Sequence, residues 1–189
     1  QILWINLVAT VALALPLAFE AKEADVMRRP PRDPRAPVLS QFVIWRTIVA
    51  GLLMTAGAIG VFQWELSNYG GQGAAPPSLL AEAQTMAVTT VIMFQIFYLQ
   101  NSRSLRGSLW QIGVFSNPFV YIGVAVILAA QAAFIYLPPL QAVFGSAPLD
   151  WKDLLVATLV GSVIAPVIAL EKWLARRLGR HPTPMRRGA

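Results

Sequence analysis

The sequence predicts an all-α membrane protein, a five-transmembrane-helix bundle with short loops. Hydrophobic residues make up 56% of the 189 residues and charged residues only 13%, whereas an ordinary soluble domain has about a quarter charged residues. Apolar stretches of about 20 residues, the length that crosses the hydrocarbon core as a helix, recur along the chain. The positive charges are confined to alternate connections between these stretches. Together these observations predict a bundle in lipid without a separate globular domain.

Five apolar stretches meet the length requirement, and segments rich in proline, glycine and charge separate them. In lipid, only helices and closed barrels satisfy every backbone polar group, and the sequence lacks the alternating pattern of barrel strands. The first stretch has no basic segment before it and no small-residue cleavage site, so we interpret it as a span and not as a signal peptide. The predicted spans are residues 1–19, 42–64, 81–100, 119–137 and 154–175.

Lysine and arginine determine the predicted orientation. Of the 15 Lys and Arg residues, all but Lys152 fall between spans one and two or at their edges, between spans three and four, or at the end of span five and beyond. The loops at 65–84 and 138–150 contain neither residue. By the positive-inside rule, a multi-pass protein of the cytoplasmic membrane is expected, with a cytoplasmic C-terminus and a basic tail at 181–189. Tryptophans near the span ends, among them Trp4, are expected to be interfacial anchors.

Composition excludes several kinds of site and partner. The chain has no cysteine, and its one histidine, His181, lies in the tail, so thiolate metal sites and histidine-based catalysis inside the membrane are excluded. The net charge of +6 is spread over short loops and the tail. Because no folded basic domain accompanies this charge, nucleic acid is not an expected partner. The lipid bilayer is the expected partner, with the tail attracted to anionic headgroups.

The polar residues inside the spans are the candidates for function, because burying polar groups in lipid is costly. The deep interiors contain no charged side chain, and Arg46 is expected at the edge of the second span. Asn6 and Thr10 are four residues apart and share one face of an α-helix, where their oxygens are suited to bind a cation. The alternative is an interhelical hydrogen bond, worth about 0.6 kcal/mol on average. Gln95 in the third span has the same two interpretations. Other neutral polar residues in the spans include Thr85, Thr89, Thr90 and Gln131.

Glycines and prolines in the spans predict local packing. Gly51, Gly57 and Gly60 in the second span are expected to permit close contact with a neighbouring helix. Pro16 and Pro166 remove a backbone donor, so a kink is expected near each of them. A freed carbonyl that binds an ion is the alternative interpretation of either proline.

Several short motifs together resemble one family, in its order and across essentially the whole chain. QILWINLV at 1–8 resembles the start of the sixth transmembrane helix of type-two P-type cation-transporting ATPases, the branch of the calcium and sodium pumps. VMRRPPR at 26–32, followed by PVLS at 37–40, is similar to the cytoplasmic loop after that helix. Three later motifs, NSRS at 101–104, FSNP at 115–118 and YLPPLQ at 136–141, resemble connections between helices eight and ten.

This resemblance implies that residues 1–180 are the C-terminal membrane domain, helices six to ten, of an ATP-driven cation pump. In that family ATP phosphorylates an aspartate of a cytoplasmic domain. The chain lacks the Asp-Lys-Thr-Gly motif and a nucleotide-binding domain, so we expect no ATP hydrolysis by this part alone and no cofactor on it. ATP and Mg²⁺ are expected in the parent pump. The implied partners are the remaining membrane helices and cytoplasmic domains of that pump and the transported cation.

The resemblance also bears on the ion. Asn6 matches the position of a family ion ligand, whereas Thr10 and Gln95 stand where calcium pumps have an aspartate and a glutamate. A divalent cation that leaves water needs compensating negative charge. The two neutral replacements therefore argue against a pair of calcium-pump-like sites. Asn6, Thr10 and Gln95 are the predicted ion-pathway residues.

Two other functions compete with the pump. One is a self-standing five-helix structural or regulatory membrane protein without pumping activity. The other is an independent channel or carrier. The sequence shows neither a ring of charge or filter-like loop, which a channel would use, nor an internal repeat, which is common in carriers.

Overall fold

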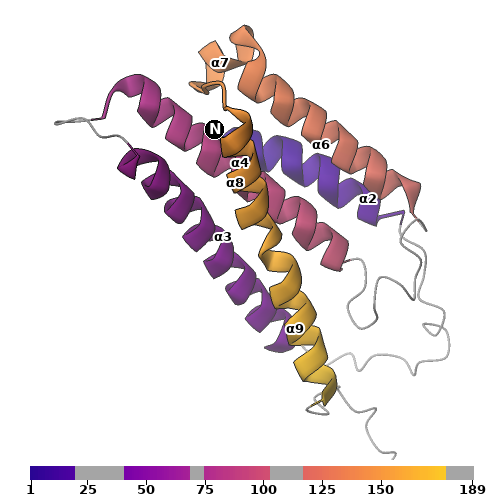
Figure 1. The fold of residues 1–189 in the computed structure, drawn as a ribbon. Helices are drawn as coiled ribbons and strands as arrows, with labels where there is room; N and C mark the ends of the chain where they lie inside the picture. The colour runs from indigo at the N-terminus through magenta and orange to yellow at the C-terminus, as the bar shows by residue number, and fades with distance from the viewer. Residues whose placement is uncertain (20–40, 69–74, 103–116, 178–189) are drawn as a thin grey trace, which may run out of the picture.

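The computed structural model describes residues 1–19, 41–68, 75–102 and 117–177, and every regular element in these ranges is a helix (Figure 1). The predicted all-helical class is therefore confirmed for this part of the chain. The predicted basic tail and the motifs at 26–32 and 37–40 lie outside the described residues.

Four helical rods are long and apolar enough to cross a membrane. They correspond to the predicted spans two to five, with boundaries that differ by a few residues. Their elements are α3 at Gln41–Ser67, α4 at Pro77–Ser102, α6 at Pro118–Tyr136, and α8 at Trp151–Ser162 continued by α9 at Ile164–Arg177.

The predicted first span is built differently from the other four. It consists of α1 at Ile2–Trp4, the π-helix η1 at Ile5–Ala14, and α2 at Leu15–Leu17. Its regular apolar part is shorter than the other rods, so a fifth crossing stays a prediction. A π-helix has hydrogen bonds from residue i to i+5. The α-helical geometry expected for Asn6 and Thr10 is therefore wrong, because both residues lie in η1.

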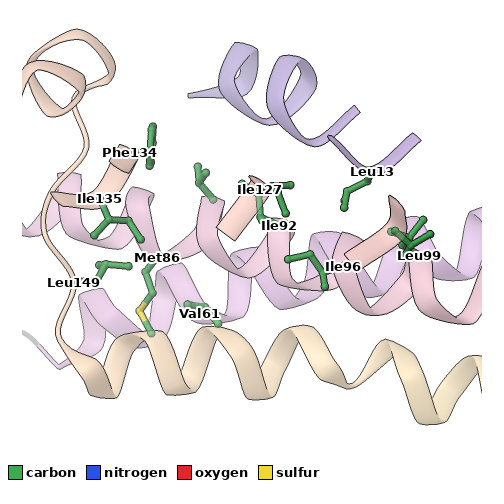
Figure 2. Close-up of a cluster of buried hydrophobic side chains, with 12 residues drawn as sticks. Leu13, Val61, Met86, Ile92, Ile96, Leu99, Ile127, Phe134, Ile135 and Leu149 are labelled. Atoms are coloured by element: carbon green, nitrogen blue, oxygen red, sulfur yellow. The ribbon is translucent and has the colours of Figure 1, made fainter. Parts of the chain in front are cut away.

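Helix α4 lies at the centre of the bundle and contacts α3, α8, α9, η1 and α6. Half of its apolar window, 50%, is buried, against 11% for α3, so α3 is peripheral. The main hydrophobic cluster surrounds α4 (Figure 2). In it, Met86, Ile92 and Ile96 of α4 pack with Leu13 of η1 and Ile127 of α6.

Prolines set the main breaks between helices. Leu137 is extended, with φ −87° and ψ 118°, and separates α6 from the short helix α7 at Pro138–Phe144. A proline disfavours the helical conformation of the residue before it, which accounts for the break at Leu137. Val163 separates α8 from α9, one turn before Pro166, whose ring disturbs the hydrogen bond to residue 162. The kink predicted near Pro166 is confirmed.

The glycine prediction is confirmed at Gly57, whereas at Gly51 and Gly60 it stays a prediction. A side chain at Gly57 would collide with the ring of Phe94 in α4, so a close helix contact exists there. At Gly51 and Gly60, a side chain would meet no described atom within 4 Å. Two further glycines that lie against neighbouring segments are Gly123 in α6 and Gly161 in α8.

Large apolar side chains cover the outside of the bundle. Leu3 is 79% exposed, Leu52 is 65% exposed and Trp151 is 70% exposed. A soluble monomer rarely exposes contiguous apolar surface on this scale, because it would associate or aggregate. The outer surface is therefore the kind that lipid covers, in agreement with a multi-pass membrane protein.

Candidate ion-pathway residues and their surroundings

Asn6 lies near the start of η1 and is exposed, whereas Trp4 and Ile5 just before it are half-buried. The backbone of Thr10 lies in the same π-helix. The side chain of Thr10 lies outside the described part, so its direction does not enter the site geometry. Asn6, the candidate on η1 whose side chain is described, thus lies on a side of the segment that the four long rods leave open.

Gln95 lies in α4 and is half-buried. Its Oε1 atom is fully buried and has no hydrogen-bond partner among the described residues. Such a buried acceptor costs free energy, about 1–3 kcal/mol in mutational studies, and native proteins rarely leave one unsatisfied. Gln95 therefore presents an acceptor oxygen for which the described protein supplies no donor.

The structure brings together the helical segments that carry the candidate residues, but it does not join the candidate side chains to each other. Helix α4, which carries Gln95, packs against η1, which carries Asn6. No hydrogen bond between Asn6 and Gln95 occurs in the described ranges. Within the same ranges, no group of three or more His, Cys, Asp or Glu side chains is arranged to hold a metal ion. Neutral oxygens are thus what the described bundle offers to a cation.

A buried chain of hydrogen bonds links α1, directly before η1, to α6 and α4. The indole Nε1 of Trp4 donates to Gln131 Oε1 at 3.1 Å, and Gln131 Nε2 donates to Thr89 Oγ1 at 2.9 Å. One turn earlier in α4, Thr85 Oγ1 accepts from the backbone N–H of Ala147 at 2.9 Å. Gln131 is 2% exposed, and Thr85 and Thr89 are both 0% exposed. The chain therefore satisfies polar groups that would otherwise be costly to bury.

Further contacts hold the first segment along the length of α6. Gln1 Nε2 lies 3.3 Å from the carbonyl oxygen of Phe144, the last residue of the short helix α7 that follows α6. At the other end, Asn117 Nδ2 donates to the carbonyl oxygen of Pro16 at 3.1 Å. Between them, Gly123 leaves room for the backbone of Ala12, because any side chain there would collide with the Ala12 carbonyl oxygen. Helix α6 thus supports the segment that carries Asn6.

An ion pair inside the bundle joins α3 to α9. Arg46 Nε donates to Glu171 Oε2 at 2.9 Å, and the two side chains are 5% and 19% exposed. The sequence predicts Arg46 at the edge of its span, and the structure places it near the start of α3. Its side chain is buried there, where Glu171 on α9 compensates its charge.

The two ends of the bundle differ in charge. Near the end of α3, Glu65 lies close enough to Asp153 of α8 and Glu82 of α4 for their negative charges to interact. At the opposite end of α3 lie Arg46 and its partner Glu171. The acidic residues from three helices thus gather at the end that the distribution of Lys and Arg assigns to the outside.

The sequence did not identify two residues near the candidates, Trp4 and Gln131, as functional. The sequence predicts an interfacial anchor at Trp4, but its indole stacks on Phe134, with ring centroids 5.1 Å apart, and donates into the bundle. Gln131 is, in the sequence, one neutral polar residue among several. In the sequence it stands out only as a single amide in one of the two most apolar spans, and its partners lie 42 and 127 residues away. Sequence spacing does not identify partners at such distances.

Known proteins resemble this chain over nearly its full length. The family model described as "Cation transporting ATPase, C-terminus" matches residues 1–174. "Probable cation-transporting ATPase F" of Mycobacterium tuberculosis is 40% identical over 182 residues, which cover 96% of this chain and 19% of that protein. "Calcium-transporting ATPase 1" of Schizosaccharomyces pombe is 30% identical over 95% of this chain and 19% of its own length.

A mammalian relative extends the comparison beyond microbes. "Calcium-transporting ATPase type 2C member 2" of Mus musculus is 32% identical over 189 residues, which cover 98% of this chain and 19% of that protein. The chain thus spans about a fifth of the length of these relatives, 19% in each case. A family model matches most of the chain, and four of its helical rods are long and apolar enough to cross a membrane. The chain therefore belongs to the family of cation-transporting P-type ATPases and corresponds to their C-terminal membrane region.

Proposed function

We propose that this chain is the membrane part of an ATP-driven cation pump, in which it lines part of the ion pathway and supports it structurally. The observation that most supports this role is Gln95 Oε1, a buried oxygen on the central helix without a donor among the described residues. The transported cation is a species that such an oxygen is suited to bind, because hard cations take amide, hydroxyl and carbonyl oxygens. Asn6, on the segment packed against the same helix, adds a second amide.

The neutral character of these residues bears on which ion is moved. Asn6, Thr10 and Gln95 supply oxygens but no negative charge, and moving an uncompensated divalent ion out of water is costly. In this proposal, a monovalent cation needs only these neutral oxygens and a few more. A divalent cation needs carboxylates from membrane helices of the parent pump that lie outside this chain. The relatives named above as calcium-transporting make Ca²⁺ the first divalent ion to test.

The chemistry of ATP belongs to other parts of the proposed pump. The chain has no Asp-Lys-Thr-Gly motif, so ATP and Mg²⁺ act on cytoplasmic domains of the parent protein, and this part alone does not hydrolyse ATP. We further propose that residues 1–180 form the membrane domain with a fifth crossing at 1–19. The basic tail at 181–189 and the C-terminus then lie in the cytoplasm. The distribution of Lys and Arg supports this orientation, because all of them but Lys152 lie in or beside the segments that the positive-inside rule assigns to the cytoplasm.

The first test is the coding sequence upstream of Gln1. A pump predicts further membrane spans and an Asp-Lys-Thr-Gly motif in the same reading frame. A start codon directly before this segment would overturn the pump and favour the self-standing structural or regulatory protein.

The second test measures ATP hydrolysis by the full-length protein against Na⁺, K⁺, Ca²⁺ and Mn²⁺. Asn6→Ala, Thr10→Ala and Gln95→Leu are each expected to raise the half-saturating cation concentration about tenfold, equivalent to about 1.4 kcal/mol of binding free energy. Matched controls are Asn68→Ala, an exposed asparagine after α3, and Gln100→Leu, a half-buried glutamine near the end of α4. Unchanged cation dependence in all three site variants would remove these residues from the pathway.

A further inference from the structure

Gln131 connects the two segments that carry the candidate ion-pathway residues. Its amide bonds Trp4, two residues before Asn6, and Thr89, six residues before Gln95 in the same helix. We propose that Gln131 is a positioning residue, which fixes η1 against α4 and thereby determines the cation affinity of the pump. This inference rests on the proposed function, in which Asn6 and Gln95 line the ion pathway.

The direction of each hydrogen bond in this connection is fixed by its chemistry. The indole of Trp4 is only a donor, so Gln131 must present its oxygen to Trp4. The hydroxyl proton of Thr89 goes to the Thr85 carbonyl oxygen at 2.8 Å. Thr89 Oγ1 therefore accepts the hydrogen bond from Gln131 Nε2, so both polar ends of the Gln131 amide have a partner. Rotating the amide by half a turn would set two donors against each other at Trp4, so one arrangement is strongly preferred.

The segment that Gln131 holds depends on contacts from outside itself. A π-helix of ten residues is uncommon, since π-helical geometry usually occurs as single turns within α-helices. Trp4, directly before η1, is held on three sides by the Gln131 amide, by Phe134 at 5.1 Å and by Phe144 at 5.2 Å between ring centroids. The aromatic contacts fix the plane of the indole. The hydrogen bond fixes its position along the bundle axis, and with it the position of Asn6.

Thr89 and Thr90 provide a matched pair of substitutions. Both are 0% exposed, and both hydroxyls donate to the carbonyl one turn back, at 2.8 and 2.9 Å. Thr89 in addition accepts the bond from Gln131. Replacing either threonine by valine removes a buried hydroxyl with little change in size, but only Thr89→Val leaves the Gln131 donor without its partner.

The experiment measures cation-stimulated ATP hydrolysis of the full-length protein with the most effective of the ions named above. Thr89→Val is expected to raise the half-saturating cation concentration about two- to tenfold, with the maximal rate and the KM for ATP unchanged. Thr90→Val is expected to leave all three quantities unchanged, and Thr89→Ser is expected to restore the wild-type value. Equal cation affinity in Thr89→Val and Thr90→Val would overturn the proposal.

A double-variant cycle tests whether Trp4 and Gln131 act as one unit. Trp4→Phe and Gln131→Leu are each expected to lower the cation affinity, and the combined variant is expected to lower it no more than Gln131→Leu alone. Additive losses would mean that Trp4 acts independently of Gln131, which contradicts the proposal.

A distance measurement separates failure of this inference from failure of the pump. Spin labels at Leu7→Cys, on the exposed side of η1, and Gln84→Cys, on the exposed side of α4, report the relative position of the two segments. Gln131→Leu is expected to shift or broaden the distance distribution, whereas Thr90→Val is not. An unchanged distribution in Gln131→Leu would overturn the positioning role. A shifted distribution in a protein without cation-stimulated ATP hydrolysis would keep the structural connection and overturn the proposed function.

Discussion

Arg46 and Glu171 form an ion pair 125 positions apart in the sequence, with the guanidinium Nε 2.9 Å from the carboxylate. The pair joins the peripheral helix α3 to α9 inside the bundle, and both side chains are largely removed from solvent. A charge buried in this way is tolerated only while its partner remains. The pair thus adds a polar connection between α3 and α9 to the packing of α3 on α4 and α8.

Glu171→Leu is expected to lower the stability of the full-length protein in detergent by about 3–5 kcal/mol, because it leaves the Arg46 guanidinium buried without its carboxylate. The double variant Arg46→Met with Glu171→Leu is expected to recover most of this loss, since no buried charge remains. Thermal unfolding measures both. Lys152→Met, at an exposed position, is the control and is expected to change stability by less than about 0.5 kcal/mol. A double variant as unstable as Glu171→Leu would contradict the prediction.

Gly123→Ala is expected to destabilise the protein by about 1–3 kcal/mol. The added methyl group would collide with the Ala12 carbonyl oxygen and lie 2.8 Å from Pro16 Cγ, so the first segment would have to move away from α6. Gly60→Ala in α3 is the control, because no described atom lies within 4 Å of the place that its methyl group would occupy. The better helix propensity of alanine is expected to make that variant up to about 1 kcal/mol more stable. Equal changes of the unfolding temperature in the two variants would contradict a tight contact at Gly123.

Gln95→Leu is expected to separate stability from cation binding. Without a transported cation, the leucine variant is expected to be as stable as the wild type or up to about 2 kcal/mol more stable, because it removes a buried oxygen that lacks a donor among the described residues. At saturating cation, the wild type is expected to gain stability through binding, and the variant to gain less. Thermal unfolding with and without the cation measures the difference. The same cation-induced gain in both proteins would argue against Gln95 as an ion-pathway residue.

Two substitutions at Asn117 are expected to separate two of its hydrogen bonds. Asn117 Oδ1 accepts from the backbone N–H of Phe119 as the cap of α6, while Nδ2 donates to the Pro16 carbonyl oxygen. Asn117→Ser keeps a capping oxygen but is too short to reach Pro16, so it is expected to cost about 1 kcal/mol. Asn117→Ala loses both bonds and is expected to cost about 2 kcal/mol. The exposed Ser67→Ala serves as the control in the same unfolding measurement. A serine variant as unstable as the alanine variant would leave no role for the cap.

The four long spans could be predicted from the sequence because hydrophobic length is a local property. Residues of a span such as Pro118–Tyr136 are apolar almost throughout, and a helix is the simplest structure that satisfies their backbone in lipid. The kink at Pro166 was equally predictable, because the missing N–H acts within one turn. The π-helical geometry of the first segment could not be predicted in this way. Its sequence is as apolar as an α-helical span, and contacts with α6 and α4 accompany the different geometry.

The surroundings of the candidate residues were predicted less well than the spans. Hydropathy places Trp4 near a span end but does not reveal that its donor faces Gln131. The same limit applies to Arg46, whose partner lies on the last helix. Glycine spacing indicates a helix that can pack closely but not which face meets a neighbour, and among the described residues only Gly57 of the three lies against one. Asn6, Thr10 and Gln95 remain predictions as ion-pathway residues.

The peripheral position of α3 makes this helix sensitive to the thickness of the membrane. Its apolar rod of 25 residues is about 37 Å long at a rise of about 1.5 Å per residue. The hydrocarbon core is only about 30 Å thick, so the rod accommodates the excess by tilting or by extending into the headgroups. Thinner bilayers increase this mismatch. Because α3 packs on α4 and α8 and is paired with α9 through Arg46 and Glu171, a change in its tilt has to be accommodated by its neighbours in the bundle.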